Sequence, residues 1–295
     1  MTRLPTTLYK KPVEPTHVIE GNDLRIPLFR GLRELYARRE VLLNLVMRDL
    51  EVKYKGSVIG IFWSLLNPIM MLLIYTVVFR YVIGMNVKNF PIFFMCGFLP
   101  WIFLSNSVTM SAPSVVNNPN LVRKVYMPRT IIPLSAVMAC LVEFVMTLVI
   151  LLAALPLFGH PPGLKAILLP LVVVLQAVFV AGLALLFSAS TVHFRDIKHL
   201  LDVLLIVWFW LTPIVYPLSK VQSLDLPYPL LSSLVAGLIN HNPMSVFVSA
   251  YRAILLQGAL PTAATFTMML IYAFGAAAIG WVLFSRSSAR FAEIV

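Results

Sequence analysis

Six long runs of apolar residues divide the chain. They cover residues 57–79, 91–116, 130–157, 166–192, 200–216 and 264–284. The first run holds 23 consecutive uncharged residues, and about 20 residues are enough to cross the hydrocarbon core of a membrane, roughly 30 Å thick, as a helix. Apolar and polar residues do not alternate within the runs, so the pattern predicts membrane-spanning helices rather than the strands of a barrel. We therefore expect an all-α integral membrane protein with six spans.

Two shorter apolar stretches, residues 228–239 and 244–257, lie between the fifth and sixth runs. Stretches of about 10 to 14 apolar residues are too short to cross a membrane and are typical of re-entrant or interfacial segments. Asn242 and Pro243 separate the two stretches, and this pair is a strong helix breaker. Over residues 228–257 we expect a helical hairpin that enters the outer leaflet and returns.

The chain before the first run has two parts. Residues 1–30 are polar, contain prolines and lack the apolar stretch of a signal peptide, so we expect a cytoplasmic tail. Residues 31–56 place most apolar side chains on one side of a helix and most charged ones on the other. This pattern predicts an amphipathic helix lying in the cytoplasmic membrane surface, followed by a single transmembrane domain over residues 57–295.

Composition and charge agree with this topology. Of all residues, 60% are hydrophobic and 12% are charged, a mixture that excludes an ordinary soluble domain. The net charge of +11 does not indicate nucleic-acid binding, because the basic residues flank the apolar runs. With the N-terminus in the cytoplasm, 18 of the 23 lysines and arginines lie on the cytoplasmic side. We expect a multi-pass protein of the cytoplasmic (inner) membrane with both termini in the cytoplasm.

The sequence contains no recognisable catalytic set. Its five histidines are scattered, and Cys96 and Cys140 both lie inside apolar runs. None of the 13 glycines is followed by lysine, so the glycine-rich loop that cradles the phosphates of ATP is absent from the sequence. We expect no catalytic residue, no metal site and no cofactor bound by this chain. If ATP powers the protein, another chain binds it.

The basic loop over residues 117–129 has two interpretations. It is either a solvated loop that sets the topology or a short docking helix that fits a groove on a partner. Its apolar side chains recur at helical spacing between two prolines: Leu121, Val122, Val125 and Tyr126.

Charged residues inside the apolar runs are candidates for function, because an ionised side chain at that depth is costly. Glu143 lies near the middle of the third run and shares a helix face with small residues, which favour helix packing. It is therefore either a structural, hydrogen-bonded side chain or a polar element of a transport path. Asp202 is the second charge that we expect to be buried.

Aromatic residues gather at the outer end of the fifth run, at Trp208, Phe209, Trp210 and Tyr216. Such residues form either a belt at the membrane interface or a surface on which sugar rings stack. Arg195, Asp202, Phe209 and Tyr216 are spaced seven apart and so share one helix face.

Several segments together resemble the permeases of ABC-2 type exporters of polysaccharides and polyol phosphates, which move O-antigen, capsule or teichoic acid precursors. The segments are residues 48–57 (RDLEVKYKGS), 60–68 (GIFWSLLNP), 194–197 (FRDI), 211–216 (LTPIVY), Asn242-Pro243 and Tyr251-Arg252. The resemblance covers nearly the whole chain from about residue 30.

The resemblance implies a homodimer with a lumen between its protomers, paired with two copies of a separate ATPase subunit that binds ATP and Mg. The helix over residues 31–56 would be the interface helix of that family. Coupling to the ATPase would involve Leu121, Arg123, Lys124, Val125, Tyr126, Arg195 and Asp196. A lipid-linked glycan, O-antigen foremost, would pass a channel whose lining we expect to include Phe62, Trp63, Trp208, Phe209, Trp210 and Tyr216.

Other functions stay open at this point. Export of teichoic acid or capsule fits the same resemblance, as does an ABC-2 exporter of drugs or other small molecules. A membrane-embedded enzyme acting on sugar lipids fits poorly, because its chemistry needs clustered carboxylates or histidines. The acidic residues are instead dispersed over Glu143, Asp196, Asp202 and Asp225.

Overall fold

The computed structural model describes residues 28–57, 60–84, 87–124, 127–222 and 229–294, and within these ranges the chain is helical with no strands. Among these residues, five stretches are long and apolar enough to cross a membrane: Leu65–Val82, Phe90–Ser111, Ile131–Phe158, Leu164–His193 and Ala263–Ser288. They coincide with five of the six predicted runs, so the prediction of an all-α membrane protein is confirmed.

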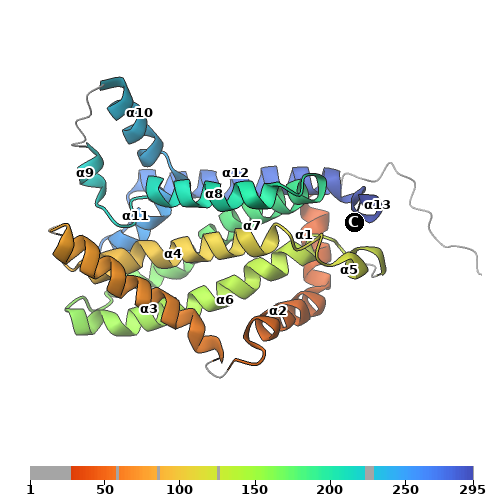
Figure 1. Ribbon diagram of the computed structural model, residues 1–295, viewed down its shortest axis with the longest axis horizontal. Coiled ribbons are helices and arrows are strands. Elements are labelled where there is room, and N and C mark those ends of the chain that lie inside the picture. The colour runs from red at the N-terminus through yellow and green to blue at the C-terminus, as the bar shows by residue number, and fades with distance from the viewer. Residues whose placement is uncertain (1–27, 58–59, 85–86, 125–126, 223–228, 295) are drawn as a thin grey trace, which may run out of the picture.

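Helices α4 (Phe90–Ser111), α6 (Ile131–Ala154), α7 (Leu169–His193) and α12 (Ala263–Ser288) form the main bundle. Helix α3 (Trp63–Tyr75) continues into the π-helical turn η2 (Thr76–Val82) and crosses the bundle at its edge (Figure 1). Short 3₁₀ turns accompany the long helices: η1 (Gly60–Phe62), η3 (Leu155–Phe158) and η4 (Leu164–Leu168).

The fifth predicted run, residues 200–216, forms a shorter helix than expected. Helix α8 (Ile197–Leu211) has 15 residues, which at about 1.5 Å per residue gives a length of roughly 22 Å. It ends where Thr212 adopts an extended conformation with φ −98° and ψ 130°. The cause is local, because a residue that precedes a proline, here Pro213, is disfavoured in the helical conformation.

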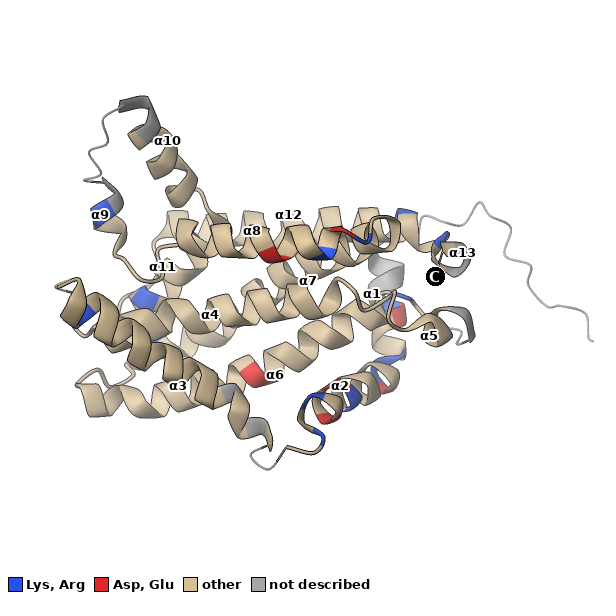
Figure 2. Cartoon of the chain, viewed as in Figure 1, with Lys and Arg blue, Asp and Glu red and all other residues tan. Residues whose placement is uncertain are grey.

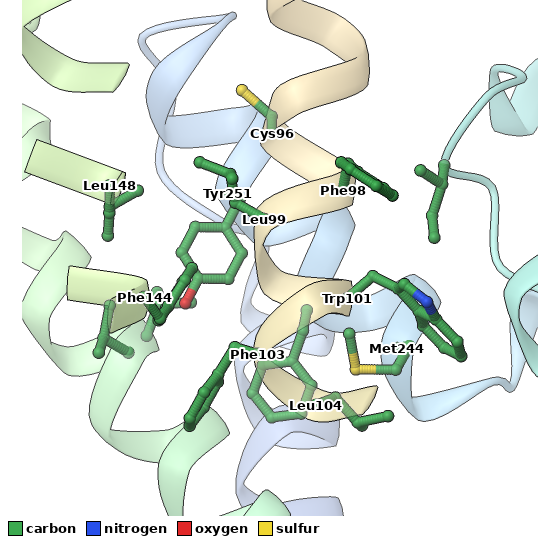
Figure 3. Packing of buried hydrophobic residues seen from close by; sticks show 14 of the residues in the cluster. Cys96, Phe98, Leu99, Trp101, Phe103, Leu104, Phe144, Leu148, Met244 and Tyr251 are labelled. Atoms are coloured by element: carbon green, nitrogen blue, oxygen red, sulfur yellow. The ribbon is translucent and has the colours of Figure 1, made fainter. Parts of the chain in front are cut away.

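Helix α4 lies at the centre of the hydrophobic core. Its aromatic side chains pack against α6 on one side and against α11 (Pro243–Leu255) on the other (Figure 3). The rings of Phe103 and Phe144 stack with their centroids 5.1 Å apart, and Tyr251 meets Phe144 edge-on at 6.1 Å. Helix α4 is therefore covered by protein on nearly every side, whereas α3 exposes most of its apolar residues.

Helices α7 and α12 approach each other closely at Gly182 and Gly280. A Cβ atom on Gly280 would overlap the backbone carbonyl of Gly182, and a Cβ on Gly182 would overlap the backbone of Ala276. Small residues allow two helix backbones to meet in this way. Both glycines are thus required for the α7–α12 contact.

The shorter elements gather at opposite ends of the bundle (Figure 1). One end, here called the α5 end, carries α5 (Pro119–Lys124), α13 (Phe291–Ile294) and α1 (Leu28–Ala37). The other end carries α9 (Leu218–Gln222) and α10 (Pro229–Asn240), which stand away from the bundle. Helices α10 and α11 form where the sequence predicts the two short apolar segments.

The segment expected to be one amphipathic helix is divided in two. Helix α1 ends at Ala37, and α2 (Arg39–Tyr54) follows after Arg38, which departs from helical geometry at φ −105° and ψ 24°. Charged residues gather on α2 (Figure 2). After α2 the chain turns through Gly56 and Gly60, both at positive φ, so the first long helix begins later than residue 57.

Candidate functional site

A buried carboxylate on α6 holds the end of α2. Glu143 is 7% exposed, and the Nζ atom of Lys53 donates to both of its oxygens at 2.8 Å. The hydroxyl of Tyr54 donates to Glu143 Oε1 at 2.7 Å. Three donor–acceptor contacts therefore stabilise a charge that would be costly alone. The sequence identified Glu143, but its partners lie about 90 positions earlier and no local pattern could reveal them.

A second polar contact joins α2 to α6 one turn earlier along α2. Asp49 pairs with Arg48 at 2.8 Å and accepts from the hydroxyl of Ser135 at 3.1 Å. Arg48 also donates to Asn118, just before α5, at 3.3 Å. The segment 48–54, which carries much of the family resemblance, thus fastens α2 to the start of α6 and to the loop before α5.

A cavity of about 380 Å³ opens beside the Lys53–Glu143 pair, between α2, α3, α4 and α6. Its polar lining includes the side chains of Asn67 on α3 and Asn106 on α4. Its apolar lining comes mainly from α4 and α6, and Trp63 lines it at the first turn of α3. The cavity falls toward the lower end of the range of small-ligand sites, roughly 300–1,000 Å³.

The predicted docking loop forms a short helix, α5, whose side chain Val122 is 5% exposed. Val122 packs into a cluster with Trp281, Phe284 and Phe291, and Leu121 packs against the same cluster. The side chains of Arg123 and Lys124, and the whole of Val125 and Tyr126, lie outside the described residues. The described part of the loop's apolar edge thus faces this chain's own α12 and α13.

Arg129 ties the docking loop to the C-terminal end of α12. Its guanidinium donates to the backbone carbonyl of Ser288, and burial lowers the pKa of this guanidinium from its ordinary value. This hydrogen bond joins the docking loop to the C-terminal end of α12. The second predicted contact, Arg195-Asp196, is exposed in the turn between α7 and α8. This turn also lies at the α5 end (Figure 1).

The aromatic residues predicted to line the channel fall into an exposed group and a group packed against α4. Phe62 and Trp63 are 64% and 50% exposed at the start of α3, and Trp210 is 50% exposed on α8. In contrast, Trp208 and Phe209 pack toward Trp101 of α4. The Tyr216 hydroxyl donates to the Trp210 carbonyl at 2.7 Å.

Asn242 fixes the junction between α8 and α11. Its side-chain oxygen accepts from the Trp208 indole at 2.7 Å and caps α11 by accepting from the Met244 amide at 3.0 Å. Its nitrogen donates to the Leu211 carbonyl at 3.1 Å and to the Thr212 hydroxyl at 2.9 Å. The Asn-Pro pair was predicted as a breaker, and its amide also orders the two helix ends.

Arg252 is a buried charge whose place the sequence analysis did not predict. Its guanidinium donates to the carbonyls of Phe93, Pro213 and Ile214 at 2.6–3.3 Å and stacks on the Phe93 ring, 3.5 Å from the centroid. A lone arginine in an apolar segment is the signal that could have identified it. Asp202, expected to be buried, is exposed on α8 of the single chain.

No three His, Cys, Asp or Glu side chains come together to hold a metal ion in the part of the chain that the structure describes. The described chemistry of the chain is that of paired charges, amides and aromatic rings.

Comparison with known proteins adds to this geometry. Residues 40–256 match the model of the ABC-2 type transporter family. The chain is 36% identical over 236 residues to the O-antigen export system permease protein RfbA of Myxococcus xanthus, covering 80% of this chain and 88% of the relative. Two Klebsiella pneumoniae proteins of the same name are 28% and 27% identical, each over 87% of this chain and 95% of the relative.

Proposed function

The chain belongs to the ABC-2 type transporter family, and from this membership we propose that it is the permease through which a lipid-linked polysaccharide of the O-antigen class leaves the cytoplasm. The observation that carries the proposal is the similarity to O-antigen export permeases over most of both chains. As a membrane subunit of a transporter, the chain is not an enzyme.

A separate ATPase subunit supplies the energy in this proposal, because no glycine of the sequence is followed by the lysine of a phosphate-binding loop. Two ATPase copies, each with ATP and Mg, would serve a dimer of this chain. Exposed apolar residues on α3 and α8 support a second copy as the neighbour of these helices.

The proposed topology has six spans: the five long apolar stretches and α8, which is the fifth span along the chain. Helix α8 begins at the α5 end and ends toward α9 and α10, as an alternating span requires (Figure 1). Placing the α5 end in the cytoplasm puts both termini inside and leaves α10 and α11 as the re-entrant pair in the outer leaflet. The basic residues of the segments at the α5 end support this orientation.

Coupling runs from the ATPase through α5 and the Arg195-Asp196 turn. Closure of the ATPase pair on ATP would shift these elements as rigid bodies. The hydrogen bond from Arg129 to Ser288 would transmit the movement of the docking loop to α12. The hydrogen bond from Arg48 to Asn118 would transmit it to α2. The polysaccharide then follows the path between protomers, past exposed aromatic residues such as Trp63 and Trp210.

The test is a pull-down of the tagged chain from native membranes, with mass spectrometry of bound proteins and lipids. We expect an ATPase subunit and an undecaprenyl-linked glycan. If the bound carrier bears teichoic acid or capsule repeats, the exported polymer is that one, and the family and the export function stay the same. A preparation that retains neither ATPase nor glycan, and that transforms a sugar lipid alone, would overturn the proposal.

A further inference from the structure

The cavity between α2, α3, α4 and α6 combines a charge pair with unused amides. Lys53 and Glu143 neutralise each other on its wall, so the cavity carries no net charge from this pair. By contrast, the side-chain amides of Asn67 and Asn106 have no hydrogen-bond partner among the described residues. Asn67 is exposed and Asn106 is partly buried, so both amides are accessible to a molecule in the cavity and can each offer it a donor and an acceptor.

The charge pair decides between the two polar ligands that a lipid-linked glycan offers. A phosphate would need a free cation, but the Lys53 ammonium is held by both oxygens of Glu143. Attracting a phosphate to Lys53 would also bring it against the Glu143 carboxylate, which is buried and would lose its partner. A neutral hydroxylated ligand meets no such repulsion and can pair with both amides.

The aromatic and apolar residues that line the cavity also favour an uncharged saccharide. Trp63 and Tyr54 contribute aromatic rings to the lining, and Phe103 and Phe144 line the apolar side. Aromatic faces match the C–H faces of sugar rings. The volume of about 380 Å³ suits a short saccharide rather than a polymer.

The position of the cavity indicates how such a ligand would be presented. Lys53 and Tyr54 end α2, and Trp63 begins α3, so the cavity lies where the surface helix meets the first span. A sugar held there can remain attached to an apolar chain that stays in the lipid beside α3, whose apolar residues are largely exposed.

We propose that this cavity binds an uncharged saccharide carried on an apolar chain, with Asn67 and Asn106 as its hydrogen-bonding residues. The inference rests on the proposed export function and locates, within one protomer, a site for the sugar part of the substrate. The site shares Trp63 with the proposed path between protomers, and its two amides lie on α3 and α4 of one protomer.

Photo-crosslinking of the full-length protein, purified with its ATPase in lipid nanodiscs, tests the site. The probes are dodecyl glycosides of glucose, galactose, mannose and N-acetylglucosamine with a diazirine on the chain, and dodecyl phosphate with the same diazirine. We expect at least one glycoside to label the peptide of α3 that borders the cavity, because its apolar chain would lie beside α3, and dodecyl phosphate not to label that peptide. An excess of the matching methyl glycoside should remove the labelling, and dodecanol should not.

Matched variants make the test specific. Asn106→Leu keeps the side-chain size but removes the amide, and should reduce labelling roughly ten-fold, the equivalent of one good hydrogen bond. Asn240→Leu makes the same change at an exposed position on α10 and should leave labelling unchanged. If Asn106→Leu fails to fold, Asn67→Leu, at an exposed position of α3, takes its place.

Three results would overturn the proposal: labelling of the same peptide by dodecyl phosphate, competition by dodecanol alone, or labelling of Asn106→Leu equal to wild type. Absence of labelling by all four glycosides would do the same. The export function is judged separately, by surface polysaccharide in a strain lacking the chain. Loss of polysaccharide in that strain, together with unchanged labelling of Asn106→Leu, would remove the site and leave the export function standing.

Discussion

Lys53, at the end of α2, places its ammonium 2.8 Å from each carboxylate oxygen of Glu143 in the middle of α6. The two partners are not equally buried, because the side chain of Lys53 is 36% exposed and that of Glu143 is 9% exposed. Removing Lys53 should therefore cost a different amount of stability from removing Glu143. This asymmetry leads to the first prediction.

Lys53→Met should destabilise the protein by about 2 kcal/mol, because it leaves a buried carboxylate without its cation. Glu143→Gln should cost only about 1 kcal/mol, since the amide oxygen still accepts from Tyr54 and the freed Lys53 can reach water. The double variant should be more stable than Lys53→Met alone. Thermal unfolding in detergent measures all three; equal losses for both single variants, with no recovery in the double variant, would contradict this account.

Gly280→Ala should lower the stability by about 3 kcal/mol, because its Cβ would overlap the backbone of Gly182 and force α7 and α12 apart. Gly275→Ala is the matched control on the same helix. A Cβ on Gly275 meets no atom within 4 Å, so this variant should be neutral or slightly more stable. Unfolding curves of the two variants give the comparison, and similar midpoints would show that the α7–α12 contact is looser than described.

Arg252→Lys should lower stability by about 2 kcal/mol and expose α11 to proteolysis. The guanidinium reaches carbonyls on α4 and on the segment after α8 from several nitrogen atoms, whereas an ammonium carries its three N–H donors on one nitrogen and cannot span them. Arg290→Lys, at an exposed position, is the control. Limited proteolysis with mass spectrometry checks the result, and equal protection of α11 in both variants would refute it.

Trp208→Leu should lower the stability of the protein, whereas Trp210→Leu should lower its export activity. Trp208 donates to Asn242, so its loss should cost about 1–2 kcal/mol of stability. Trp210 is half exposed and should instead affect export, giving shorter polysaccharide at the cell surface with unchanged stability. Combining Tyr216→Leu with Trp208→Leu and Trp210→Leu in one triple variant should give a larger export defect than Trp210→Leu alone. Unchanged chain length on a polysaccharide gel would return these residues to an interfacial belt.

Charge reversal at Arg123 and Lys124 should uncouple ATP hydrolysis from export while the protein stays inserted and paired with its ATPase. The reason is that the proposed coupling passes through α5. Lys165→Glu, on the exposed turn η4 before α7, serves as the control and should export normally. ATPase activity and surface polysaccharide are measured together. Normal export in the reversed variant would refute the docking role.

Local patterns predicted most of the fold and little of the site. Long apolar runs identify helices because each residue's environment is lipid or core, so five spans were located to within several residues. The predicted helix ends were wrong where a single residue changes the backbone conformation. Pro213 ends α8 early, and Gly60, at positive φ, makes the first long helix begin later. Glu143 and the segment 48–57 were each singled out, but their contact depends on helix packing over about 90 positions, which one sequence cannot specify.

The short length of α8 has a consequence for the surrounding lipid. Under the six-span topology α8 spans the membrane with roughly 22 Å of helix, whereas α12 has 26 residues and exceeds the thickness of the hydrocarbon core. Lipid next to α8 must thin to meet the shorter helix, and this hydrophobic mismatch brings the two head-group layers closer together. A polar head group that changes leaflet along α8 therefore travels a shorter distance through hydrocarbon than it would elsewhere in the membrane.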